Sequence, residues 1–192
     1  MASLVELRDR LRRRPGMAGL ADEQAEDLLD EAADMVREYC GWPVWPRQTV
    51  TVVVDARGGD MVPLPTLMLH EVTSVEQRPL FDQSPAAWQP VEGGWDWSEG
   101  GWLLRCGCWP DGPRSLRVVM DSGYEEPPGA VGSVLLALAV GIARRPGRVA
   151  SMRVGGESVT YQQAGGSGSG AFGELSDGER AVLDRYRLDN RP

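Results

Sequence analysis

The residues best suited to chemistry in this sequence are its three cysteines and its single histidine. Cys106 and Cys108 are separated by one glycine, which is the nearest approach to a metal-binding motif. A tetrahedral zinc site needs a second pair of ligands, and His70 alone does not supply it. His70 also lacks a Cys or Ser motif that would make it the base of a catalytic triad. We therefore expect no metal and no other cofactor, and free thiols at Cys40, Cys106 and Cys108.

Three other patterns could carry chemistry, and each has a simpler structural interpretation. Gly155-Gly156 does not introduce a helix, so it is not a phosphate-binding loop. The segment 168–170 (Gly-Ser-Gly) lies in a glycine- and serine-rich stretch, not in the strand-turn-helix context of a hydrolase nucleophile. The acidic face of a helix expected at 22–40 lacks His and is most simply a solvated surface. Because no acid–base pair is clustered, we expect no catalytic residues and a protein that is not an enzyme.

Tryptophans are concentrated in one part of the chain. Five lie within 22 residues: Trp88, Trp95, Trp97, Trp102 and Trp109. Tryptophan rings on a β surface can stack on sugars or peptides, which leaves a carbohydrate- or peptide-binding module as an alternative function. The pattern favours a role in a small core or a protein interface, where tryptophan is enriched.

Helical periodicity appears before and after this region. Leucines at 4, 7 and 11 predict a short first helix with a capping box at Ser3, and apolar residues between 25 and 39 predict a second helix at 22–40. A central helix at 127–145 is apolar nearly all round, which predicts burial on most sides. Its apolar run is too short to span a bilayer, so we expect no membrane partner. A capping box at Ser176 predicts a last helix that extends to about Leu188.

Between the second and central helices the period changes to that of strands. Alternation at 48–55, a hairpin around Gly100-Gly101 and alternation at 115–121 predict a β-rich insertion at about 48–121. Strands grouped between helices, rather than alternating with them, predict an α+β fold: a small helical bundle with this insertion and a tethered C-terminal helix. A flexible linker is expected at about 162–173 and a C-terminal docking segment at about 174–192, within a single domain covering 1–192.

Composition narrows the possible partners. The 192 residues carry 20 Lys and Arg against 28 Asp and Glu, a net charge of −8. This is the wrong sign for a protein that binds nucleic acid through its phosphates. No signal peptide is evident, and an odd number of cysteines suits a reducing compartment.

The last predicted helix has the format of a helix that docks into a groove. Its apolar stripe is flanked by arginines, and the candidate docking residues are Arg180, Val182, Leu183, Arg185, Tyr186 and Arg187. A helix of about a dozen residues is marginal alone in water, so we expect it to need a surface to pack on.

Eleven segments together resemble one family. They are 20–29, 36–42, 67–75, 94–97, 102–105, 109–114, 116–119, 123–127, the central helix at 127–145, 154–161 and 175–186. In this order they are similar to the head-to-tail adaptor proteins (connector or head-completion proteins) of tailed bacteriophages. This chain departs from the family in an arginine-rich first helix and a long linker.

The resemblance implies a structural virion protein. It would form a homo-oligomeric ring, of twelve copies by analogy, between the portal and the tail, completing the head and extending the DNA channel. Its partners would be the portal, the next head-completion (stopper) or tail protein, and double-stranded DNA that passes without specific binding. It would assemble in the host cytoplasm and reside in the neck of the virion, with the C-terminal segment docked on the portal.

Overall fold

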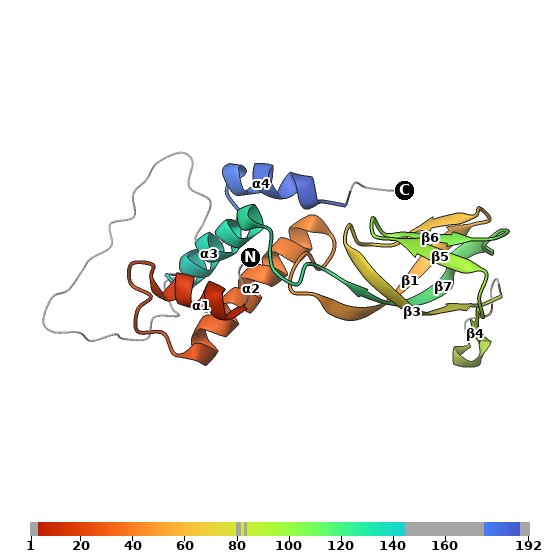
Figure 1. Cartoon of the computed structure of the whole chain (residues 1–192), viewed down its shortest axis with the longest axis horizontal. Helices are drawn as coiled ribbons and strands as arrows, with labels where there is room; N and C mark the ends of the chain where they lie inside the picture. Colours follow the sequence, from red (N-terminus) through yellow and green to blue (C-terminus); the bar gives the residue numbers. More distant parts are fainter. Residues whose placement is uncertain (1–3, 80–81, 83, 145–174, 189–192) are drawn as a thin grey trace, which may run out of the picture. The chain divides into compact units, whose positions relative to one another are not determined.

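The structure is a computed structural model that describes residues 4–79, 82, 84–144 and 175–188. It divides into two compact units, which are described separately (Figure 1). Unit 1 comprises Met1–Met35 and Pro128–Arg185, and unit 2 comprises Val36–Pro127 and Tyr186–Pro192. The predicted α+β class is confirmed: helices form unit 1, and antiparallel strands dominate unit 2.

Unit 1 is built from four helical segments. They are α1 (Leu4–Arg12), most of α2 (Asp22–Cys40), α3 (Gly129–Ala143) and α4 (Asp177–Leu183). Both α1 and α4 pack on α3. As the sequence predicts, α3 is the most buried helix, because Val131, Leu135, Leu136 and Ile142 are at most 1% exposed on several sides of it. Pro128 is the N-cap of α3, where the missing N–H of proline costs no hydrogen bond.

Arginines of α1 tie it to the start of α2. The Nη1 of Arg8 donates to Glu26 Oε1 over 2.6 Å, and Arg12 pairs with Asp22 while its Nε donates to Leu20 O over 3.1 Å. Leu7 and Leu11, which directly precede these two arginines in sequence, are fully buried. Some of the arginines in this helix therefore form ion pairs within the chain, with acidic residues at the start of α2.

Two antiparallel sheets make up unit 2. One has the order β1 (Gln48–Arg57), β7 (Asp111–Ser122), β3 (Leu69–Gln77), β4 (Gln89–Pro90). The other has the order β2 (Met61–Pro63), β6 (Trp102–Arg105), β5 (Trp95–Ser98). A short 3₁₀ helix, Pro85–Ala87, precedes β4. The hairpin predicted around Gly100-Gly101 is confirmed as β5–β6, with Trp97 opposite Leu103.

The two sheets share one apolar core. Buried residues of the first sheet include Leu69, Leu116 and Met120, and those of the second include Val62 and Leu103. The pairing of β1 with β7 joins residues 54 to 74 positions apart, from Arg57 with Asp111 to Gln48 with Ser122. This long-range ladder brings the two ends of the β-rich segment together.

Several predicted boundaries differ from those observed. The first strand extends to Arg57 rather than Asp55, since its pairing with β7 continues past a bulge between Val54 and Ala56. The last α-helix ends at Leu183, and a 3₁₀ turn, Asp184–Tyr186, replaces its expected continuation to Leu188. Its predicted capping box is confirmed, with Ser176 and Glu179 reciprocally bonded. The cap at Ser3, the Gly155-Gly156 pair and the linker at 162–173 lie outside the described residues.

Candidate interaction surfaces

The six candidate docking residues do not share one exposed face. Arg180, Arg185 and Arg187 are exposed, Val182 and Tyr186 are half-buried, and Leu183 is completely buried within unit 1. The expectation of an apolar stripe open to a partner is therefore not met at Leu183, because α4 already packs on α3. The three arginines remain as the part of the segment available for docking, and their role stays a prediction.

Residues after α4 are anchored in unit 2. The Nε1 of Trp42 donates to the backbone oxygen of Tyr186 over 2.5 Å, and the backbone N–H of Leu188 donates to Cys40 O over 2.9 Å. The Tyr186 ring meets Tyr124 edge-on at 6.3 Å between centroids. Trp42 is 1% exposed, so its indole N–H is satisfied in a buried setting by the C-terminal segment. We call Tyr186–Leu188 the C-terminal strap.

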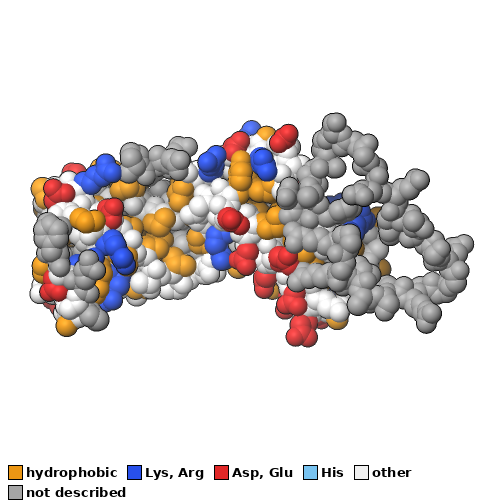
Figure 2. All heavy atoms as spheres, turned by 180° about the vertical axis from the view of Figure 1, so that it is seen from behind, with side chains coloured by type: hydrophobic (Ala, Val, Ile, Leu, Met, Phe, Trp, Pro, Cys, Tyr) orange, Lys and Arg blue, Asp and Glu red, His pale blue; other side chains and the backbone are white. Residues whose placement is uncertain are grey.

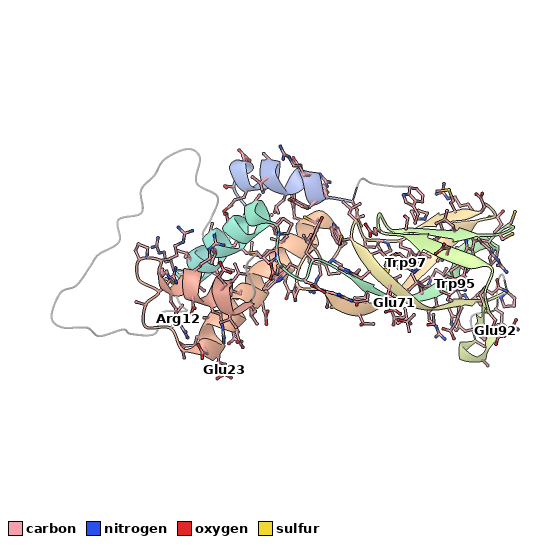
Figure 3. All side chains as sticks on the ribbon, in the orientation of Figure 1. Arg12, Glu23, Glu71, Glu92, Trp95 and Trp97 are labelled. Atoms are coloured by element: carbon pink, nitrogen blue, oxygen red, sulfur yellow. The ribbon has the colours of Figure 1, made fainter. Side chains whose placement is uncertain are left out.

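The tryptophan cluster contributes mainly to the core of unit 2. Trp109 is 2% exposed and belongs to the core, and Trp95 and Trp97 on β5 pack against it (Figure 3). The Nε1 of Trp95 donates to Val91 O over 2.9 Å. None of the five rings is exposed. The core interpretation of the sequence is thus confirmed for these three rings, and an open stacking groove for sugars is not formed by them.

Arginines stack on two tryptophan rings of unit 2. The guanidinium carbons of Arg78 and Arg117 lie 5.0 and 4.8 Å from the ring centroid of Trp88, and that of Arg105 lies 4.9 Å from the ring centroid of Trp109. Arg117 also pairs with Glu76. This pairing lowers the pKa of Glu76, because the charged carboxylate accepts the hydrogen bond. We call these five arginine and tryptophan residues the arginine–tryptophan surface.

A charged cluster stands at the beginning of β1 and the end of β7. Arg47 pairs with Asp121 and Glu125, and its Nε lies 2.7 Å from Asp121 Oδ2. The hydrogen bond from Arg47 lowers the pKa of Asp121, against the opposing effect of its partial burial. His70 is bonded through Nε2 to Gly123 O over 2.8 Å. These contacts connect strand ends, and they give the histidine a structural partner.

In the described structure the three cysteines form no disulfide bond. Cys40 is buried in α2, while Cys106 and Cys108 are exposed after β6. Among the described residues no three His, Cys, Asp or Glu side chains gather as a metal-binding group. None of the described helices is both long and apolar enough to cross a membrane.

Sequence patterns did not reveal the arginine–tryptophan surface or the C-terminal strap. Arg78, Trp88 and Arg117 are spread over 40 positions and come together only through the pairing of β3 with β7 and β4. The single available signal was the coincidence of five tryptophans with several arginines in one segment. The strap contact joins Trp42 to Tyr186, 144 residues apart, and has no local signature.

Three solved structures of similar fold come from gene transfer agent particles. The neck of an empty gene transfer agent (GTA) particle computed with C6 symmetry matches with a TM-score of 0.61 at 18% identity. The virion of a native GTA particle matches with 0.61 at 19%, and the neck of a native GTA particle computed with C12 symmetry with 0.59 at 16%. Each match covers 98% of this chain and 90% of the other. No protein-family profile and no curated protein matches the sequence.

Proposed function

We propose that this chain is a structural protein of the neck of a tailed virus-like particle, where it forms a ring between portal and tail. The observation that carries the proposal is the fold shared, over nearly the whole of both chains, with proteins from solved GTA necks. The resemblance of eleven sequence segments to head-to-tail adaptors supports the same function independently. The ring would complete the head and extend the channel for DNA.

Symmetry supports a ring of many copies. Two of the similar structures were computed with sixfold and twelvefold symmetry. A ring requires a head-to-tail interface between copies, and such an interface closes only at a fixed rotation. Twelve copies is the number that agrees with both symmetries and with the family resemblance. The portal on one side and a stopper or tail protein on the other are the proposed neighbours.

The charge of the chain suits a DNA conduit. A net charge of −8 repels the phosphates of a passing duplex and prevents it from adhering to the wall. The function therefore needs no specific contact with DNA. It also needs no catalytic group, which agrees with the structural roles found for His70 and for the charged clusters.

Arg180, Arg185 and Arg187 are the proposed docking residues for the portal. They are exposed along α4 and the turn that follows it, while the apolar side of α4 is used within unit 1. The docking surface would thus be charged rather than apolar, and would fit acidic residues of the portal. Arg187 also lies 5.6 Å from the ring centroid of Tyr39, which orients it.

Disruption of the gene in a strain that produces the particle tests the function. We expect filled heads without attached tails, restored by the intact gene. A triple R180Q/R185Q/R187Q variant should be produced as a folded protein but should not restore tailed particles. The control is an R13Q/R14Q variant, which removes two exposed arginines of unit 1 that lie outside the docking segment. This control should restore tailed particles. Normal tailed particles without the gene would contradict the proposal.

A further inference from the structure

Part of the arginine–tryptophan surface borders a hollow of about 380 Å³ that is open to solvent. Its polar lining consists of Gln77, Arg78, Gln89, Arg105 and Cys108, with Trp109 among its apolar residues. The lining includes two guanidiniums and no carboxylate, in a chain whose net charge is −8. Figure 2 shows arginine side chains close to apolar ones over unit 2, at the left of the view. The lining of the hollow is therefore positively charged, whereas the chain as a whole is negatively charged.

Both arginines of the hollow are held in place by uncharged groups. The Nε of Arg78 donates to Arg114 O over 2.8 Å, and its guanidinium stacks on Trp88. The Nη1 of Arg105 donates to Gln77 Oε1 over 3.2 Å, and its guanidinium stacks on Trp109. In the part of the chain that the structure describes, neither arginine forms an ion pair. Each guanidinium thus keeps hydrogen-bond donors for a ligand, in an orientation that is already fixed.

A third donor in the hollow has no partner. Trp109 is 2% exposed, and among the described residues its indole Nε1 has no acceptor. A buried donor without a partner costs about 1–3 kcal/mol, so buried indole N–H groups normally find an acceptor. Trp42 and Trp95 follow this rule, with backbone oxygens of Tyr186 and Val91. The exception at Trp109 leaves one unsatisfied donor in a residue that lines the hollow.

We propose that this hollow binds a carboxylate side chain from an acidic segment of a partner protein. A carboxylate accepts two parallel hydrogen bonds from a guanidinium fork and can accept further ones from the amides of Gln77 and Gln89. The carboxylate of Asp82 does not line the hollow; it accepts from the Ser84 N–H over 3.0 Å, which lowers the pKa of Asp82, and the charge of Arg78 lowers it further. The inference concerns unit 2 alone and does not depend on the proposed place in a particle neck.

Other anions fit less well. Duplex DNA is bound tightly through about 6–10 phosphate contacts, whereas this hollow supplies two guanidiniums in an acidic chain. A free small anion would remain largely hydrated in a hollow open to solvent, because small-ligand sites normally bury about 70–90% of the ligand. A carboxylate carried by a protein segment gains further contacts around the hollow, with the prolines and ring edges that line it.

The test uses the full chain and a capped hexaglutamate peptide, with hexaserine as the uncharged control peptide. Titration is followed by the ¹H–¹⁵N signal of the Trp109 indole. Hexaglutamate should shift this signal saturably and hexaserine should not. Both R78Q and R105Q should weaken the affinity about tenfold, the equivalent of one lost charge-assisted bond. R57Q removes an exposed arginine of unit 2 that does not line the hollow, and should leave the affinity unchanged.

Three outcomes would overturn the proposal. One is no shift of the Trp109 signal at saturating hexaglutamate. Another is an equal loss of affinity in R57Q, which would mean general charge attraction. The third is tighter competition at the hollow by a 20-base-pair duplex, which would assign it to nucleic acid. R105K serves as the second variant if R105Q does not fold: it keeps the charge but loses the planar fork, so affinity should still fall.

Discussion

Gly101 shows how tightly one residue can be constrained in a hairpin. Its φ is +80°, and a Cβ at this position would lie 2.2 Å from the backbone oxygen of Thr66. The backbone N–H of Leu64 also donates to Gly101 O over 2.7 Å. We expect Gly101→Ala to destabilise unit 2 by more than about 3 kcal/mol, because backbone rather than a flexible side chain must move. Urea unfolding followed by tryptophan fluorescence measures this change.

The neighbouring glycine provides the matched control. A Cβ on Gly100 would meet its nearest atoms at 3.9 Å, an ordinary contact distance. Gly100→Ala should therefore change the free energy of unfolding by less than about 1 kcal/mol. Equal destabilisation by the two substitutions would mean that general loss of hairpin flexibility, and not the approach of Thr66, governs this turn.

The Arg47–Asp121 pair gives unit 2 a dependence on acidic pH. Arg47 lowers the pKa of Asp121 in the folded protein below its ordinary value of 3.8. A carboxyl whose pKa is lowered by folding adds stability above its unfolded pKa, and this contribution is lost as the pH falls through the folded value. Stability from the pair should therefore be complete at pH 6 and decline below about pH 4.

Arg47→Gln tests this dependence. The variant should be less stable than the original protein at pH 6, where the partly exposed pair is intact, and this difference should shrink towards pH 2. Asp121→Asn should give a smaller loss with the same direction of pH dependence, because Arg47 keeps its pair with Glu125, and the double variant should cost little more than Arg47→Gln alone. A difference that stays constant between pH 6 and 2 would attribute the loss to packing of the Arg47 side chain.

At the scale of elements, α4 has one feature that the local sequence predicts and one that it does not. Ser176 and Glu179 predict the capping box. The burial of Leu183 cannot be predicted locally, because it depends on the packing of α4 on α3. Leu183→Ala should destabilise the protein by about 2–4 kcal/mol, the usual cost of removing a fully buried leucine side chain. Thermal and urea unfolding of the full chain measure it.

Two comparisons separate packing from docking in α4. Val182→Ala, at a half-buried position, should cost less than half as much as Leu183→Ala. R180Q should be within about 0.5 kcal/mol of the original protein, since its side chain is exposed. If Leu183→Ala changed the free energy of unfolding as little as R180Q does, the apolar side of α4 would not be packed within the chain. Leu183 would then be a docking residue, as the sequence predicts.

Local periodicity predicted the elements much better than it predicted their arrangement. The bounds of α2 and the β5–β6 hairpin follow from patterns within the segments themselves. Strand order does not, because β1 pairs with β7 rather than with its neighbours in sequence. The arginine–tryptophan surface was missed for the same reason: Arg78 and Arg117 meet at Trp88 only through the pairing of β3 with β7.

At the scale of the whole molecule, charge argues against spontaneous assembly. The chain has a mass of 20.9 kDa and a net charge of −8, so contacts between copies must overcome mutual repulsion. Salt weakens this repulsion, since the screening length falls from about 30 Å at 0.01 M to about 8 Å at 0.15 M ionic strength. Each unit also has a buried core of its own within one copy.

We therefore predict that the isolated chain is monomeric at micromolar concentration in low salt and forms a ring only on its assembly partner. One feature favours association of the isolated chain. β1 is a long edge strand that pairs on one side with β7, and exposed edge strands can pair with another copy. The repulsion of like-charged copies should prevail at about 0.01 M salt, with association increasing as salt is added. Sedimentation velocity across a salt series measures both effects. A stable dodecamer in low salt without a partner protein would show that contacts between copies outweigh the charge, and that the ring needs no template.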